Sequence, residues 1–454
     1  MQCEKCGSQL EPEMELCPQC GTKIDRDEGK GASLGKRMKM LKVVKIVVSV
    51  LLVLSLMCAM VMVIFKDELI PGHWFSSLPG SIPKDGNSDN ITCEGTYTSS
   101  RFAIKGKSDA VVAQIGDEVL TNAQLQVFYV IVRNNFFQTY TNLSEINLDK
   151  TLPMDRQTCG LDESLSWQQY FLQEALDQWR LYVLLCRKAD VAGCKLTEAE
   201  QQTLNERTAN YNKMYVESGE YASLDAWAAD VYGPGCIYAD YQHYATMAAL
   251  ASKYYNQMIK EQEALVTEED IEGFYEEQKE LFEIYNIQKG DGNITVDVRH
   301  ILITVKAATG KEEHIEETDW EKTKEKAQEV LDQWLAGEAT EESFAALVEW
   351  HSADPGSNLN GGLYAGVQKG DMVAEFEAWC FDASREPGDY GLVRTDHGYH
   401  IMYFVGSEEL WHNISKQNAP TWRTNKLLEQ ERDALSVQIR YNKICTWEEA
   451  YYAE

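Results

Sequence analysis

Two stretches of the sequence carry apolar or aromatic residues two positions apart, and both predict β-strands. The first follows residue 297 and has apolar residues at positions 301 and 303; the second has apolar or aromatic residues at 399, 401 and 403. A period of two places alternate side chains on one face of a strand. We therefore expect His300 and His400, which lie in these stretches, to meet on neighbouring strands.

Most of residues 109–290 show the helical period instead. Residues 110–120 predict a short hairpin, and Thr121 begins a capping box that opens a long helix. Two more helices are predicted between the strands, at 320–334 and 343–350. An apolar stripe at i, i+4, i+7, i+11 and i+14 predicts a buried helix face, and it consists of Leu172, Leu176, Trp179, Val183 and Cys186.

A run of twenty residues without a charge extends from Ile46 to Phe65. This is the length that a helix needs to cross a bilayer, whereas a buried helix of a soluble domain is rarely so uniformly apolar. Five Lys or Arg residues precede the run closely, which predicts a cytoplasmic N-terminus and an extracytoplasmic remainder. A cleaved signal peptide is disfavoured because the leading segment is long and no small-residue cleavage site follows.

Residues 66–108 are rich in Pro, Gly, Ser, Asn and Asp and lack apolar periodicity, so we expect an extended linker. The chain as a whole has 454 residues, of which 44% are hydrophobic and 10% aromatic. Such a length and composition predict two or three folded domains with sizeable cores and exclude a disordered protein.

The first 20 residues contain four cysteines in the spacing C-x2-C-x10-C-x2-C, with a glycine directly after each pair. Four thiolates in two such turns predict a structural, tetrahedral Zn²⁺ site, which leaves no open ligand position for catalysis. The alternative, redox or disulfide chemistry, is disfavoured in a cytoplasmic segment. The predicted ligands are Cys3, Cys6, Cys17 and Cys20. Such a ribbon could bind a cytoplasmic partner that the sequence does not identify.

The net charge of the chain limits which kinds of molecule it is expected to bind. The net charge is −30, and without residues 1–45 it is −32, from 33 Lys and Arg against 65 Asp and Glu. Nucleic acid and anionic lipid surfaces are therefore not expected to bind the region after the apolar run. Seven cysteines follow that run, and because an odd number cannot all pair, we expect no designed disulfide framework.

Several motifs stand in a fixed order between residues 297 and 405: an Arg-His-Ile-Leu strand at 299, Asp-Pro-Gly at 354, Gly-Gly at 361, and Thr-Asp-His-Gly-Tyr-His-Ile at 395. This ordered set resembles the parvulin family of peptidyl-prolyl isomerases, over about a quarter of the chain. The resemblance implies that the catalytic residues are His300, Asp354, Thr395 and His400. It also implies that the proline-binding residues are Met372, Phe376, Tyr364 and Phe381, with Met372 and Phe376 four apart on one helix.

One part of the motif departs from the family. Parvulins usually have Gly-Gly-Asp-Leu-Gly where this chain has Gly-Gly-Leu-Tyr-Ala-Gly at 361–366. The bulky Tyr364 would narrow the proline pocket, so a domain that binds chains without isomerising them, a holdase, is the alternative to an active enzyme. Taken singly, a histidine in an apolar strand is more often a hydrogen-bonded core residue than a catalytic one. Asp354 before Pro-Gly is by itself typical of a turn, and Met372 and Phe376 are typical of a core.

The order of hairpin, helical domain and parvulin domain also resembles the PrsA and SurA type of extracytoplasmic foldase and chaperone. We therefore predict an α+β protein in which a parvulin domain, a small antiparallel sheet with surrounding helices, is inserted in a mostly α-helical chaperone domain. Its expected substrates are unfolded or partly folded exported polypeptides with X-Pro bonds, met outside the cell membrane. The predicted parts are a zinc ribbon (1–25), a basic segment (26–45), a transmembrane helix (46–65), a linker (66–108), a chaperone domain (109–290), a parvulin domain (295–406) and a C-terminal helical segment packing on the chaperone domain (407–454).

Overall fold

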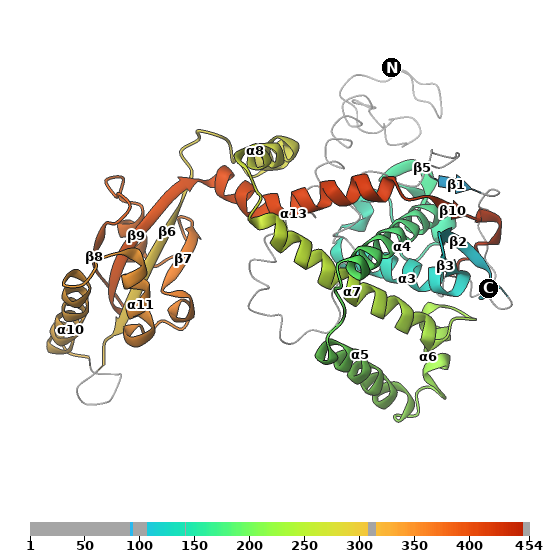
Figure 1. The fold of residues 1–454 in the computed structure, drawn as a ribbon, viewed down its shortest axis with the longest axis horizontal. Helices are drawn as coiled ribbons and strands as arrows, with labels where there is room; N and C mark the ends of the chain where they lie inside the picture. The colour runs from blue at the N-terminus through green and yellow to red at the C-terminus, as the bar shows by residue number, and fades with distance from the viewer. Residues whose placement is uncertain (1–90, 94–106, 141, 307–314, 448–454) are drawn as a thin grey trace, which may run out of the picture. The chain divides into compact units, whose positions relative to one another are not determined.

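The computed structural model describes residues 91–93, 107–140, 142–306 and 315–447. The four ribbon cysteines and the apolar run at 46–65 lie outside these residues. Within the described part, no helix is both long and apolar enough to span a membrane. The chain divides into two compact units, one made of residues up to 254 with those from 428 onward, and one made of residues 255–427 (Figure 1).

A four-stranded sheet in the first unit joins the two ends of the described chain. Its order is β1 (Ile91–Cys93), β10 (Val437–Ile439), β2 (Val111–Ile115) and β3 (Glu118–Thr121). The hairpin of β2 and β3 forms as predicted and turns at Gly116, whose φ of 57° favours glycine. β10 pairs antiparallel with β2 and parallel with β1, so segments more than 300 residues apart along the chain form one sheet.

Helices make up most of the remainder of this unit. The predicted capping box is present at Thr121, whose hydroxyl accepts from the Gln124 N–H at the start of α3 (Asn122–Thr139). The predicted apolar stripe lies on α4 (Trp167–Val191), where its first four members are at most 1% exposed and Cys186 is half-buried. The other elements are η1 (Leu143–Ile146), η2 (Met154–Arg156), β4 (Thr158–Cys159), β5 (Asp162–Ser166), α5 (Glu198–Tyr211), η3 (Asn212–Val216), α6 (Leu224–Tyr232), α7 (Tyr238–Glu263) and η5 (Tyr441–Lys443).

The second unit is built around an antiparallel sheet of order β7-β6-β9-β8. The two predicted strands are its central pair, β6 (Ile294–Thr304) and β9 (Gly398–Glu409), flanked by β7 (Leu363–Val367) and β8 (Tyr390–Thr395). The helices are α8 (Glu268–Glu277), α9 (Lys279–Ile284), α10 (Glu317–Leu335), α11 (Glu341–His351), η4 (Asn358–Asn360), α12 (Ala374–Cys380) and α13 (Leu410–Asp433).

The two faces of this sheet carry different helices. Ile301, Ile303 and Ile401 point to one face and pack against α10 and α11, which lie beside the sheet in Figure 1. Val298 and Met402 point to the other face and pack against α12. His300 and His400 share the α12 face because strand side chains alternate. The sheet thus separates a packed core from the face that carries the site.

The C-terminal segment is only partly helical. α13 ends at Asp433, and the chain then forms β10, a strand that the sequence did not predict. Both α7 and α13 cross the division between the two units. The domain limits expected at 290 and 407 therefore stay predictions.

Candidate functional site

Two histidines meet at the centre of the β6–β9 pair. His400 lies opposite Leu302 in the strand register and His300 lies opposite Met402, so the two imidazoles are diagonal neighbours on one face. Their Nδ1 atoms are 3.0 Å apart, and the rings stack at a centroid distance of 5.2 Å with 20° between their planes. His300 is 2% exposed and His400 is 5% exposed. The sequence prediction that these two side chains meet is therefore realised in the fold.

Hydrogen bonds extend from the pair in both directions. The Thr395 Oγ1 lies 2.8 Å from His400 Nε2, and Asp354 Oδ2 lies 3.0 Å from His300 Nε2. The backbone N–H of His397 donates to the Thr395 oxygen, so its hydroxyl hydrogen is available for His400. Four predicted catalytic residues thus form one connected chain.

The geometry favours one direction for the protons when both rings are neutral. The ionised Asp354 carboxylate accepts only, so His300 Nε2 carries a hydrogen and His300 Nδ1 is left as an acceptor. His400 then donates from Nδ1 to His300, and its Nε2 accepts from Thr395. Every polar atom of the two buried rings is satisfied in this arrangement, which fixes both tautomers.

The Asp354 carboxylate is held ionised by its donors. Oδ2 faces His300, the Ser357 hydroxyl and the Tyr364 hydroxyl, which is 3.0 Å away. Oδ1 accepts the N–H of Gly356 within the turn that the Asp-Pro-Gly sequence forms. The hydrogen bond from His300, followed by the one from Ser357, holds the pKa of Asp354 well below its usual range despite partial burial.

Burial disfavours the charged form of His400, whereas Asp354 stays charged. Desolvation, followed by the neighbouring His300 and His397, lowers the pKa of His400 from 6.5 to about 3. Its ring is therefore neutral at physiological pH and is suited to hydrogen bonding rather than to carrying charge. Burial, followed by the Asp354 charge, raises the pKa of Tyr364 to about 12, so that phenol remains a donor.

An apolar wall stands beside the histidines. The Phe376 ring on α12 meets both imidazoles edge-on, with centroids 5.3 Å from each. Phe376 is buried with Met402 and Phe404 of β9, while Met372 and Phe381 are half-buried against the same cluster. All four predicted proline-binding residues thus lie on this wall or border it, since Tyr364 packs there as well.

Two details differ from the sequence prediction. Met372 does not share a helix with Phe376, because α12 begins only at Ala374 and Met372 lies in the bend before it. Ser357, 1% exposed, was not predicted at all, yet its oxygen lies 3.1 Å from His300 Nε2 and its hydroxyl donates to Asp354. The spacing Asp-x-x-Ser across a turn was the available signal, since a side chain at i+3 of a turn returns toward residue i.

No metal enters this account of the site. The described residues contain no cluster of three or more His, Cys, Asp or Glu side chains placed to hold an ion. The predicted zinc ligands Cys3, Cys6, Cys17 and Cys20 lie outside the residues that the structure describes.

Comparison with known proteins identifies the domain that carries the site. Residues 280–406 match the family model described as a PPIC-type PPIase domain. The prediction of a peptidyl-prolyl isomerase domain of the parvulin type is therefore confirmed. The matched segment contains all four members of the hydrogen-bonded chain.

Known foldases and chaperones are similar to parts of this chain. The foldase protein PrsA of Halalkalibacterium halodurans is 27% identical over 38% of this chain and 42% of its own length. The chaperone SurA of Pseudomonas fluorescens is 32% identical over 32% of this chain and 31% of its own length. A crystal structure of PrsA from Bacillus subtilis is 17% identical over 59% of this chain and 88% of that chain, with a TM-score of 0.28. The chain thus matches less than half the length of the two curated relatives.

Proposed function

We propose that this chain is a membrane-anchored, extracytoplasmic peptidyl-prolyl cis/trans isomerase that assists the folding of exported proteins. The observation that supports it most is the buried chain Thr395, His400, His300 and Asp354, with the Phe376 ring against both imidazoles. The matched PPIase domain and the likeness to PrsA foldases agree with it.

The reaction needs a shaped environment more than a reactive group. Rotation about a peptide bond has a barrier of roughly 18–20 kcal/mol, and no bond is made or broken. At the top of the barrier the amide loses its resonance and resembles an isolated carbonyl next to an amine. An apolar surface that grips the proline ring and excludes water favours this twisted form over the planar one.

The described residues supply such an environment. The partly exposed Met372 and Phe381 provide the apolar surface, and they pack on the buried cluster that contains Phe376, Met402 and Phe404. The neutral His400 adds no charge there, and Asp354 keeps its negative charge at the outer end of the network, with its side chain 14% exposed. The chain of fixed hydrogen bonds orients the imidazole dipoles before substrate binds, which avoids reorganisation during rotation.

The experiment that tests the proposal measures exchange between the cis and trans forms of short X-Pro peptides by NMR, with the full chain in detergent micelles. The proposal predicts exchange faster than in detergent alone for at least one residue before proline. Uncatalysed exchange takes tens to hundreds of seconds, so acceleration is readily measured. Exchange at the uncatalysed rate for every peptide would contradict it.

A holdase is the second candidate, and Tyr364 is the observation that favours it. The Tyr364 hydroxyl is bound to Asp354, and its ring stands 5.3 Å from His300 and 6.5 Å from Phe376, so it takes up part of the space beside the pair. A holdase would suppress the aggregation of an unfolded client without changing the exchange rate of any peptide. Light scattering by such a client, measured with the same preparation, distinguishes the two candidates.

Anchoring and zinc binding belong to the same proposal. The uncharged run at 46–65 and the basic residues before it support a single membrane span with the N-terminus in the cytoplasm. The spacing of Cys3, Cys6, Cys17 and Cys20 supports one structural Zn²⁺ in the cytoplasmic ribbon. The polypeptide substrates are then those that emerge on the outer side of the membrane.

A further inference from the structure

Beyond the start of β7, the edge of β6 is completed by the segment that leads into the Asp354 turn. Directly before β7, the Gly362 carbonyl oxygen accepts the N–H of His300. Backbone groups two residues apart on a strand point to the same side, so those of Leu302 point to where β7 no longer runs. Leu302 is 8% exposed, and its backbone groups therefore need another partner.

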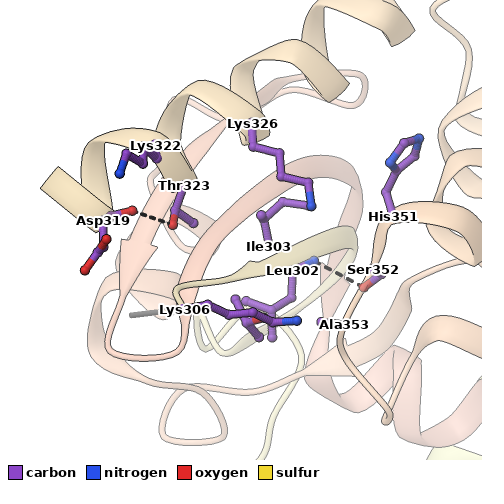
Figure 2. A pocket seen from close by; sticks show the side chains of 11 residues that line it. Leu302, Ile303, Lys306, Asp319, Lys322, Thr323, Lys326, His351, Ser352 and Ala353 are labelled. Carbon is purple, nitrogen blue, oxygen red and sulfur yellow. Dashed lines mark hydrogen bonds between the residues drawn. The ribbon is translucent and has the colours of Figure 1, made fainter. Parts of the chain in front are cut away.

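Ser352 and Ala353 take the place of the missing strand. The Leu302 N–H donates to the Ser352 hydroxyl oxygen at 3.2 Å, and the Leu302 carbonyl oxygen accepts the Ala353 N–H at 2.8 Å. Figure 2 shows the first of these bonds, beside an open pocket of about 380 Å³ that both Leu302 and Ser352 line. The Ser352 oxygen thus stands where a backbone carbonyl of a partner strand would accept.

The same hydroxyl oxygen also holds the start of the turn. It accepts the N–H of Asp354 at 3.3 Å, while the Ser352 N–H donates to the Val348 carbonyl oxygen at the end of α11. One serine therefore joins β6, α11 and the turn. Because Leu302 lies two residues from His300, the turn is attached about 7 Å along the strand from the residue whose ring its carboxylate contacts.

The orientation of the turn depends on the Ser352 bonds. The bond between Ala353 and Leu302 alone would let the segment rotate about it, since a single bond fixes a distance but no direction. The Ser352 oxygen removes that freedom because it binds one N–H of the strand and one N–H of the turn. Asp354 Oδ2 lies 3.0 Å from His300 Nε2, and a displacement of about 1 Å would carry it beyond hydrogen-bond range.

We propose that Ser352 is a positioning residue of the isomerase, whose hydroxyl fixes the Asp354 turn on β6 so that the carboxylate holds the His300 ring in one tautomer. This role rests on the proposed function and adds a residue outside the hydrogen-bonded chain of the site. Ser357 and Tyr364 bind the carboxylate itself, whereas the Ser352 hydroxyl accepts from backbone groups and acts through the position of Asp354.

Removal of the Ser352 hydroxyl should change both the rate and the His300 tautomer. A small misplacement of a catalytic group lowers the rate steeply, so we expect kcat to fall about tenfold. KM should stay near its unmodified value because the apolar surface at Met372 and Phe381 is untouched. Once the carboxylate is displaced, the Ser357 hydroxyl, 3.1 Å from His300 Nε2, can donate to that atom and permit the other tautomer.

The test compares Ser352→Ala with Ser352→Thr in the full chain in detergent micelles. Thr keeps the hydroxyl and suits the extended backbone here (φ −79°, ψ 130°), and the open pocket leaves room for its methyl group. NMR exchange of an X-Pro peptide gives kcat and KM. Ring ¹⁵N shifts of the histidine-labelled chain report the tautomers, and the signals missing in His300→Ala identify that ring.

The two variants should differ in both measurements. In Ser352→Ala we expect kcat about tenfold lower and a mixture of His300 tautomers. In Ser352→Thr, kcat should stay within about twofold of the unmodified value, and the hydrogen of the ring should remain on Nε2.

Ser343→Ala is the matched control for stability. Ser343 lies in the first turn of α11, at the opposite end of the helix from Ser352, and its hydroxyl oxygen also accepts a backbone N–H, that of Thr340. Chemical denaturation should show that both alanine variants lose stability. Ser343→Ala should nevertheless keep the unmodified kcat and the single His300 tautomer.

Three results would overturn the positioning role of Ser352. They are a single Nε2–H tautomer of His300 in Ser352→Ala, the same loss of kcat in Ser352→Thr, and the same loss of kcat in Ser343→Ala. Failure of the unmodified chain to accelerate exchange would contradict the isomerase instead. The His300 tautomers in the two Ser352 variants would then still decide whether this hydroxyl fixes the turn.

Discussion

Tyr364 is a residue at which this chain departs from the usual parvulin motif. It stands where parvulins usually have leucine, and its hydroxyl is one of three donors that face Asp354 Oδ2. The space for it is tight, because a Cβ on Gly356 would meet the Tyr364 hydroxyl at 2.7 Å. The side chain that was expected to narrow the proline pocket therefore also donates a hydrogen bond to the carboxylate next to His300.

Replacing Tyr364 with Phe removes that donor and keeps the ring. Because a hydrogen bond to a charged group contributes about 1.5–3 kcal/mol, we expect the free energy of unfolding to fall by about 1.5 kcal/mol. Chemical denaturation measures this loss. The control is Tyr390→Phe, since Tyr390 is 45% exposed and its phenol is not among the donors of the site. Equal stability of the two variants would show that the hydrogen bond from Tyr364 to Asp354 does not contribute to the free energy of unfolding.

His400 predicts a pH dependence of stability. Its pKa of about 3 in the folded protein lies below the unfolded value near 6.5, so only the unfolded chain takes up this proton between those values. Stability should therefore fall as the pH drops below 6.5, by at most about 1.4 kcal/mol per pH unit from this residue. Ring ¹⁵N shifts measured from pH 7.5 to 5 should show His400 neutral throughout; a midpoint near 6.5 would contradict the buried, uncharged ring.

The residues of the site were predictable to different degrees. His300 and His400 follow from the strand period, since alternation alone places them on the same face. The bond of Ser357 to Asp354 has a local signal in the Asp-x-x-Ser spacing, whereas the bond of Tyr364 to Asp354 depends on how the turn folds back against β7, which no local pattern encodes. The spacing of Met372 and Phe376 predicts that both lie on one helix, but α12 begins two residues after Met372.

At the scale of elements, a close backbone contact joins β6 at His300 to Gly362, the residue directly before β7. The N–H of His300 donates to the carbonyl oxygen of Gly362 at 2.9 Å, and Gly362 has a φ of 74°. A Cβ there would lie 2.4 Å from the His300 carbonyl oxygen and 2.9 Å from Val348 Cγ2. Only glycine lets the two backbones approach so closely.

Gly362→Ala should therefore destabilise the second unit more than an ordinary glycine substitution does. The positive φ alone costs about 1–2 kcal/mol, and the contact with His300 adds to it. Gly370→Ala is the control, since its φ is 100° with nothing within 4 Å of the added Cβ. Denaturant unfolding should show the larger loss for Gly362→Ala; equal losses would mean that the backbone relaxes away from the contact.

β10 is an element that the sequence pattern does not predict. It is three residues long, too short for alternation to be seen, and its partners β1 and β2 lie more than 300 residues earlier. The helices that the pattern did predict are long and periodic, as α4 and α10 are. Strands formed by distant pairing need the tertiary fold to define them.

At the scale of the whole molecule, the histidine site lies in one compact unit, and the residues of the proposed ribbon and anchor lie at the start of the sequence. The purified chain should contain about one Zn²⁺, because four thiolates complete a tetrahedral site. Cys3→Ser combined with Cys17→Ser should remove it, as measured by atomic absorption. Cys194→Ser, outside the motif, should keep the metal. Full zinc content in the double variant would contradict the ribbon.

The central claim is that the network through the two histidines catalyses proline isomerisation, and cis/trans exchange NMR on X-Pro peptides tests it most directly. The account predicts that the unmodified chain accelerates exchange and that His300→Ala and Asp354→Ala each lower the catalysed rate roughly 10- to 100-fold. His243→Ala, in the first unit and outside the network, should keep the full rate. Exchange that is equally fast in the His300 and Asp354 variants would contradict the account.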